Sequence, residues 1–207
     1  MSLLTRRVIS FLFLLAVYVM LGFAVSGRPA GNLDQGETLF AGHSIAVAAF
    51  FTEAGTFPVY VALCILTLVL GTLRRGWFGS ALVIIVALLG AWATSDLFKE
   101  LFRRSRPEQW YALHETSFSY ASGHATLSLV FYGTWMYLLW RTLPGTAWRN
   151  ALLALIGLWV LAIGWSRLAL GAHWPTDLLG GYLLGAAWLM LSMTAVDVLL
   201  ARQRTAA

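Results

Sequence analysis

The chain has 207 residues, of which 59% are hydrophobic and 11% are charged. A soluble domain carries about a quarter charged residues, so the composition excludes an ordinary soluble fold and indicates a membrane protein. The formal net charge is +5, but no basic patch with interleaved aromatic residues lies on a polar segment, so nucleic acid is not an expected partner. The lone cysteine, Cys64, excludes an intrachain disulfide. The sequence carries no signal for an oligomeric state.

Long apolar runs predict an all-α polytopic membrane protein, a bundle of six transmembrane helices in a single domain over residues 1–207. Each run approaches the ~20 residues that a helix needs to cross a bilayer. The predicted spans are 8–26, 55–73, 78–98, 123–140, 150–168 and 178–200. Arg6 and Arg7 leave a cleaved signal peptide as the alternative for the first run, although its apolar core is longer than usual. Residues 39–52 are apolar but short, and they predict a helix on the membrane surface.

Arginine residues mark one side of the predicted bundle. They are Arg6, Arg7, Arg74, Arg75, Arg141, Arg149, Arg202 and Arg204. By the positive-inside rule this side is cytoplasmic, and both termini lie there. The segment "KELFRRSRP", residues 99–107, is basic yet lies on the outer side, so topology does not account for it.

Lys99, Arg103 and Arg106 of this segment follow one another at i, i+4 and i+7. If the third span continues as a helix beyond the membrane, the three side chains share one face, and Pro107 ends that helix. The alternative is a solvated or headgroup-binding run of charges.

A second outer segment, "SYASGHATLS" at 119–128, begins the fourth span. Ser122 is the predicted N-cap, and Gly123 lets the backbone approach a ligand closely. The exposed amides and the dipole of a helix N-terminus form an anion site, and His124 follows directly. The alternative is a capped helix start with an interfacial histidine.

The third segment, "WSRLALGAHWPTDLLGG" at 165–181, carries Arg167, His173 and Asp177. Pro175 suits the first turn of a helix. The i, i+4 spacing lets Asp177 accept a hydrogen bond from one ring nitrogen of His173, which leaves the other nitrogen free to attack. Such a pair can also be structural or half of a metal site, but no second ligand cluster accompanies it, so no metal is predicted. Together the three segments predict a phosphate pocket with a nucleophile and an acid.

The patterns K-x6-R-P, S-G-H and S-R-x5-H-x3-D, in this order, resemble the three signature motifs of the type-2 phosphatidic acid phosphatase superfamily. The resemblance covers about residues 55–200, and it implies a membrane branch with six spans and a site at the outer face. One departure is Ala121, which stands where the family usually has proline before S-G-H. The loop that enters the helix is therefore expected to be less rigid.

The resemblance also implies roles for the site residues. His173 would attack phosphorus and become phosphohistidine, Asp177 would orient it, and His124 would act as general acid. The groups expected to neutralise the phosphoryl oxygens are Lys99, Arg106, Arg167, Ser122 and the Gly123 amide. Arg103 is expected to contact a second phosphate or a headgroup, and Arg104 is expected to be solvated.

The function that the resemblance implies is that of a lipid phosphatase of the bacterial cytoplasmic membrane. It would need no metal or cofactor, and its site would face the periplasm or exterior. Its expected partners are the bilayer and a lipid phosphate, with undecaprenyl pyrophosphate first, then phosphatidylglycerol phosphate or phosphatidic acid. Vanadium haloperoxidases share the site residues but are soluble. A non-catalytic lipid or anion transporter is the other alternative, but it would bury ionisable groups near the bilayer midplane.

Overall fold

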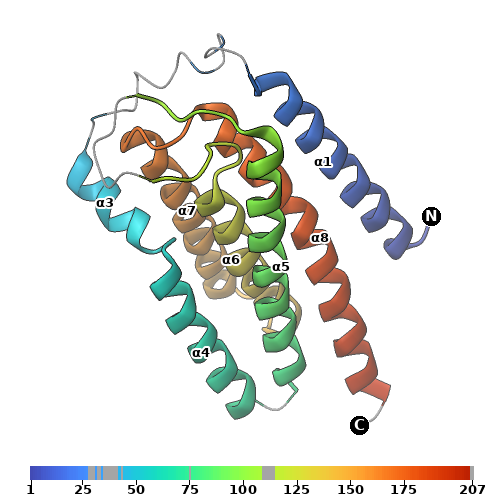
Figure 1. Cartoon of the computed structure of the whole chain (residues 1–207). Helices are drawn as coiled ribbons and strands as arrows, with labels where there is room; N and C mark the ends of the chain where they lie inside the picture. Colours follow the sequence, from blue (N-terminus) through green and yellow to red (C-terminus); the bar gives the residue numbers. More distant parts are fainter. Residues whose placement is uncertain are drawn as a thin grey trace.

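The computed structural model describes residues 1–27, 31, 34, 42, 44–74, 76–108 and 115–205. Throughout these ranges the regular structure is helical, which confirms the predicted all-α class. The helices are α1 (Leu3–Val25), α3 (Ile45–Glu53), α4 (Phe57–Leu73), α5 (Phe78–Phe102), α6 (Gly123–Thr142), α7 (Ala147–Ala169) and α8 (Pro175–Thr205) (Figure 1).

Four helices are long and apolar enough to cross a membrane, namely α1, α5, α7 and the Pro175–Gln203 part of α8. α3 and α4 meet the same criterion together, as a pair bent by 44°. α6 has 20 residues but does not meet it. The described residues therefore contain four candidate spans, or five if α3 and α4 form one broken span, as in a multi-pass membrane protein. The predicted count of six is not confirmed.

The segment predicted to lie on the membrane surface, residues 39–52, overlaps α3. Residues 39–41 and 43 of this segment lie outside the described residues, as does Arg75 of the predicted cytoplasmic side. The surface position of the segment stays a prediction.

α6 occupies the interior of the bundle, where it packs against α5, α7 and α8 (Figure 1). Its buried hydroxyl groups lower its hydropathy, but each is satisfied within the protein. Thr134 donates to the carbonyl of Val130 at 2.7 Å and lies 2.8 Å from the hydroxyl of Ser192 on α8. Hydroxyl groups that bond helix carbonyls and neighbouring helices are tolerated inside membrane bundles. The polar side of α6 thus faces protein rather than lipid.

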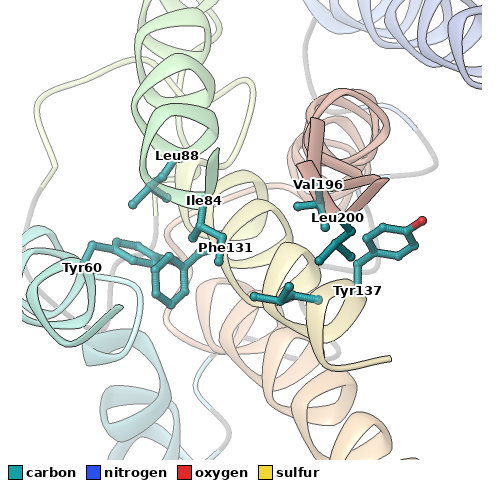
Figure 2. Packing of buried hydrophobic residues seen from close by; sticks show 8 residues of the cluster. Tyr60, Ile84, Leu88, Phe131, Tyr137, Val196 and Leu200 are labelled. Atoms are coloured by element: carbon teal, nitrogen blue, oxygen red, sulfur yellow. The ribbon is translucent and has the colours of Figure 1, made fainter. Parts of the chain in front are cut away.

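A cluster of buried apolar residues joins α4, α5, α6 and α8, and Figure 2 shows its packing. The cluster comprises Tyr60, Ile84, Leu88, Phe131, Tyr137, Leu138, Val196 and Leu200. The rings of Tyr60 and Phe131 meet edge to face with centroids 5.8 Å apart. The outer surface is also apolar, with exposed side chains such as Phe13, Ile65 and Leu158. Such a surface is stable against lipid but not in water.

α1 packs on α8 and is held by polar contacts near both of its ends. Arg7 forms an ion pair with Asp197 of α8 at 2.8 Å and donates to the hydroxyl of Tyr137 at 2.7 Å. Arg141 contacts the same aspartate at 3.2 Å, so two arginines assigned to the same side do lie together. Near the other end, the hydroxyl of Tyr120 donates to the carbonyl of Tyr18 at 2.7 Å.

α5 continues past the predicted span, which ends at residue 98, but it stops before Pro107. Its last residue is Phe102, and Arg103 has a left-handed backbone with φ of 45°. Residues 103–107 are not helical. The expectation that Lys99, Arg103 and Arg106 share one helical face is therefore wrong. The left-handed residue turns the chain away from the helix axis, and the residue that follows, Arg104, becomes buried.

Candidate active site

The three segments that carry the predicted site residues meet at one end of the bundle, where α5 and α7 end and α6 and α8 begin (Figure 1). Two backbone hydrogen bonds join these segments. The amide of Ser122 donates to the carbonyl of Asp177 at 3.0 Å, and the amide of Ser119 donates to the carbonyl of Arg104 at 2.8 Å. Residues from distant parts of the sequence are thereby fixed around one point.

His173 and Asp177 lie together and are almost fully buried. The Nδ1 atom of His173 is 3.5 Å from Oδ2 of Asp177 and 3.4 Å from the hydroxyl of Ser119. Ser119 and the backbone amide of Trp174 donate to the same carboxylate oxygen, the latter at 2.9 Å. The Nε2 atom of His173 faces Nη1 of Arg106 at 3.1 Å. The carboxylate thus lies on one side of the ring and a cation on the other.

Three cations, Arg106, Arg167 and Lys99, lie around this ring. Arg106 donates from Nε to the carbonyl of Ser117 at 2.8 Å. Arg167 donates to the hydroxyl of Thr52 at 2.7 Å. Lys99 donates to the hydroxyl of Ser117 at 3.3 Å. Each cation thus has at least one neutral partner that helps to keep it in place.

Glu115 occupies the space between two of these cations, and the sequence did not identify it as a site residue. Its carboxylate accepts from Nη2 of Arg106 at 2.8 Å and from Nη2 of Arg167. Burial raises the pKa of Glu115, but the charges of Arg167 and Arg106 outweigh burial and hold the pKa below its usual value. A signal was present, because Glu115 is the only acidic residue between Glu108 and Asp177. Its ionised carboxylate takes a position suited to a phosphoryl group.

His124 lies beside these cations at the start of α6. Its ring is hydrogen-bonded to the backbone of Thr52, and its Nε2 atom is buried without a partner among the residues described. The link between α3 and α4 approaches the ring so closely that a Cβ on Gly55 would lie 2.4 Å from it. His124 is therefore fixed in position with one ring nitrogen available to a ligand.

Ser122 and Gly123 form the predicted helix start, but not as a side-chain cap. Ser122 is the N-cap by position, yet its buried hydroxyl has no hydrogen-bond partner in the described part of the chain. A Cβ on Gly123 would meet no described atom within 4 Å. The space beside Gly123 is therefore open, and a ligand can approach the first amides of α6.

Arg104 was expected to be solvated, and this expectation is wrong. The residue is 3% exposed, and its Nη1 atom donates to Oδ1 of Asp177 at 2.6 Å. Two buried aspartates compensate its charge, the other being Asp34 at 2.5 Å. Arg103, by contrast, points to the surface with 71% of its side chain exposed. The structure places it outside the cluster around His173.

A cavity of about 490 Å³ opens between α4, α5 and α6. Its polar end contains Lys99, Glu115, Gly123 and His124. Its remaining wall is apolar and includes Tyr60, Val61, Cys64 and Ile65 of α4 and Leu89 and Trp92 of α5. The cavity therefore joins the cationic cluster to a lining that suits a hydrocarbon chain.

The electrostatics of the site favour a neutral imidazole on His173. Burial lowers the pKa of His173 well below 6.5, and the charges of Arg106 and Arg167 lower it further. An unprotonated imidazole has the free lone pair that a nucleophile needs. Within the described residues, no three His, Cys, Asp or Glu side chains are grouped so that they could hold a metal ion. The donors present fit a phosphate anion.

Comparisons with known proteins find similar sequences and one matching family. The model of the PAP2 superfamily matches residues 80–200. Phosphatidylglycerophosphatase B of Bacillus subtilis (strain 168) is 33% identical over 116 residues, which are 54% of this chain and 55% of that protein. The putative undecaprenyl-diphosphatase YbjG of Escherichia coli (strain K12) is 32% identical over 110 residues, 51% of this chain and 49% of that protein. The chain thus spans about half the length of the curated relatives it matches.

The fold is shared with a solved structure. The crystal structure of a transmembrane PAP2-type phosphatidylglycerolphosphate phosphatase from Bacillus subtilis superposes with a TM-score of 0.76 at 23% identity. The superposition covers 88% of this chain and 94% of that one. The matched family region contains all three motif segments, from Lys99 to Asp177. The chain therefore belongs to the PAP2 superfamily.

Proposed function

We propose that this chain is an integral membrane lipid phosphatase, with its helices forming one domain. It removes phosphate from a lipid phosphate or diphosphate through a phosphohistidine on His173 and requires no metal ion. Undecaprenyl diphosphate is the first candidate substrate, followed by phosphatidylglycerol phosphate and phosphatidic acid. The printed names of the two curated relatives support this choice of substrate class.

The observation that carries the proposal is the continuity of the cavity with the cationic cluster. Lys99 and His124 lie at one end, and apolar side chains of α4 and α5 line the rest. A lipid phosphate has the same division into an anionic head and an apolar chain. Ligand sites of this kind derive affinity from apolar walls and orientation from a few polar groups. A soluble phosphate ester would leave the apolar wall uncovered.

In the first step, Nε2 of His173 attacks phosphorus, a nitrogen–phosphorus bond forms, and the bond to the lipid oxygen breaks. His124 carries a proton on Nε2 when the anionic substrate is bound beside it, and it gives that proton to the departing oxygen. Lys99, Arg106 and Arg167 stabilise the charge on the phosphoryl oxygens, for which the Glu115 carboxylate must move aside. In the second step, water attacks the phosphohistidine, its proton passes to His124, and phosphate leaves.

Phosphate release from detergent-solubilised full-length protein tests the proposal. The three lipids are compared with glucose 6-phosphate, and His173→Ala serves as the inactive control. We expect each lipid that is a substrate to turn over faster than the sugar phosphate. Faster turnover of the sugar phosphate than of every lipid would contradict the placement of the substrate in the apolar cavity.

We also propose that the site faces the periplasm or cell exterior of a bacterial cytoplasmic membrane, with both termini in the cytoplasm. The support is the arginine distribution and the proximity of Arg7 and Arg141 at Asp197. Single cysteines at Glu108 and Arg149, introduced into Cys64→Ala, are expected to react with impermeant reagents from opposite sides of the membrane. Labelling of both from one side would refute the orientation.

A further inference from the structure

Arg104 connects the Asp177 carboxylate to a second buried aspartate. Its Nη1 atom donates to Oδ1 of Asp177 at 2.6 Å, and its Nη2 atom donates to Oδ2 of Asp34 at 2.5 Å. None of the three side chains is more than 4% exposed. The guanidinium therefore lies in a desolvated position where every change in the surrounding charge is strongly felt.

Asp34 also fixes the first turn of α8, the helix that carries Asp177. Its Oδ1 atom accepts from the backbone amide of Thr176 at 3.1 Å and from the Thr176 hydroxyl at 2.7 Å. The same hydroxyl accepts from Nη1 of Arg104 at 2.7 Å. Asp34 lies in the segment between α1 and α3, outside the family-matched residues 80–200. The N-terminal part of the chain thus reaches the catalytic end of the bundle.

The charges of this cluster add to one net negative charge. Two carboxylates face one guanidinium, so Asp177 retains the capacity to balance a positive ring on His173. Without Asp34, the charge of Arg104 would be compensated by Asp177 alone. Without Arg104, two carboxylates would remain buried with no cation between them, which is costly.

We propose that Arg104 and Asp34 are positioning residues of the phosphatase reaction. They hold the carboxylate of Asp177 toward His173 and set the net charge that His173 experiences when its ring becomes phosphorylated. This inference rests on the proposed function, and it assigns Asp34 a role that the three sequence motifs do not include.

Three variants separate the charge effect from a packing effect. Asp34→Asn brings the net charge of the cluster to zero, Arg104→Gln makes it more negative, and the double variant restores the original value. Glu108→Gln, at an exposed position near the end of the same basic segment, is the matched control. The other groups around His173 are the same in all variants; they are Lys99, Arg106, Glu115, Ser119 and Arg167.

The readouts are kcat, KM and the acid limb of kcat/KM. Removal of a carboxylate disfavours an imidazolium, so Asp34→Asn should move the acid limb to lower pH. Removal of a guanidinium favours an imidazolium, so Arg104→Gln should move it to higher pH. Each single change should lower kcat roughly tenfold, with KM little changed. This is the lower end of the loss that is typical when a residue that orients a functional side chain is replaced. The double variant should return the limb toward that of the wild type.

NMR titration of the His173 ring, assigned by its loss in His173→Ala, gives the same shifts without turnover. If the wild type shows no phosphatase activity but the ring titrations still move in opposite directions, the proposed function fails while the effect of Arg104 and Asp34 on the charge felt by His173 stands. If the wild type is active and neither single change moves the ring titration, the positioning role is refuted. Arg104→Lys, which keeps the charge, provides a milder variant should Arg104→Gln not fold. It should leave the titration near that of the wild type while lowering kcat, and a titration shifted as in Arg104→Gln would refute the charge argument.

Discussion

The Nε2 atom of His173 lies 3.1 Å from Nη1 of Arg106. A guanidinium only donates hydrogen bonds, so this contact requires Nε2 to be the acceptor. The ring proton then resides on Nδ1, which faces Asp177 and Ser119. The arrangement prepares the nitrogen next to the phosphate-binding cations as the nucleophile, and it disfavours a second proton on the ring.

The first prediction concerns pH. Because burial and then Arg106 lower the pKa of His173 below 6.5, the neutral ring persists as pH falls through that value. The acid limb of kcat/KM assigned to His173 should therefore lie well below pH 6.5. Phosphorus NMR of the free substrate measures the ionisation of the substrate phosphate, so that its titration can be separated from that of His173. An enzyme limb at or above pH 6.5 would contradict the neutral resting state.

The second prediction concerns the covalent intermediate. His173→Ala should abolish turnover, and Asp177→Asn should slow it, since the ring loses its orienting carboxylate. The wild type quenched during turnover should carry phosphate that is labile in acid and stable in base. Activity should persist in excess EDTA, and vanadate should inhibit as a mimic of five-coordinate phosphorus. Loss of activity in EDTA with recovery on adding magnesium would show that a metal supplies the charge assigned to the cations.

His124 gives the third prediction, which depends on the leaving group. Its Nε2 atom is buried and has no partner in the described residues, so a proton on this nitrogen can pass to the departing oxygen. His124→Ala should slow phosphoenzyme formation by about 10²–10⁴-fold, the usual range for a general acid. The loss should be largest for poor leaving groups, as measured by single-turnover phosphorylation. An equal loss for good and poor leaving groups would point to a role in binding instead.

Glu115 gives the fourth prediction. Its carboxylate bridges Arg106 and Arg167, so it competes with any phosphate that binds between them. Glu115→Gln should tighten inhibition by inorganic phosphate and by vanadate roughly tenfold, which corresponds to about 1.4 kcal/mol. Glu100→Gln, an exposed change at the end of α5, should leave both inhibition constants unaltered. Weaker inhibition in Glu115→Gln would mean that the carboxylate assists binding of the anion.

The fifth prediction uses two glycines with different surroundings. A Cβ at Gly55 would lie 2.4 Å from the His124 ring, whereas a Cβ at Gly157 would have its nearest contact at 4.0 Å. Gly55→Ala should therefore displace His124 and lower kcat while the bundle stays folded. Gly157→Ala is the matched control and should retain activity. Comparable activity of the two variants would show that the ring has room to shift without loss.

The motif residues were predictable from the sequence because their spacing is local. His173 and Asp177 are separated by one helical turn, and Ser122 precedes the start of α6. Once both helix starts are placed at the same end of the bundle, these residues must approach one another. Their mutual position follows from short-range geometry combined with membrane topology.

Arg104, Asp34 and Glu115 were not predictable in this way. Arg104 is adjacent to exposed Arg103 in a basic run, and it turns inward directly after the left-handed backbone of Arg103. Its partner Asp34 lies far away in the sequence and has no motif around it. A local sequence pattern does not reveal which charged residues form ion pairs across the bundle, because the pairing depends on tertiary contacts. The number of spans could not be counted from the sequence for a related reason. The polar side of α6 faces protein, so it lowers the hydropathy of the helix without contacting lipid.

The ion pair between Arg7 and Asp197 joins the first helix of the chain to the last. During synthesis, α1 enters the membrane long before Asp197 leaves the ribosome. An arginine without a counter-ion is costly in hydrocarbon and is drawn toward the headgroups, so nascent α1 has little reason to settle against its neighbours. The arrival of α8 supplies one aspartate to Arg7 and also to Arg141 of α6. The ion pairs that tie α1 and α6 to α8 can therefore form only after α8 has been synthesised.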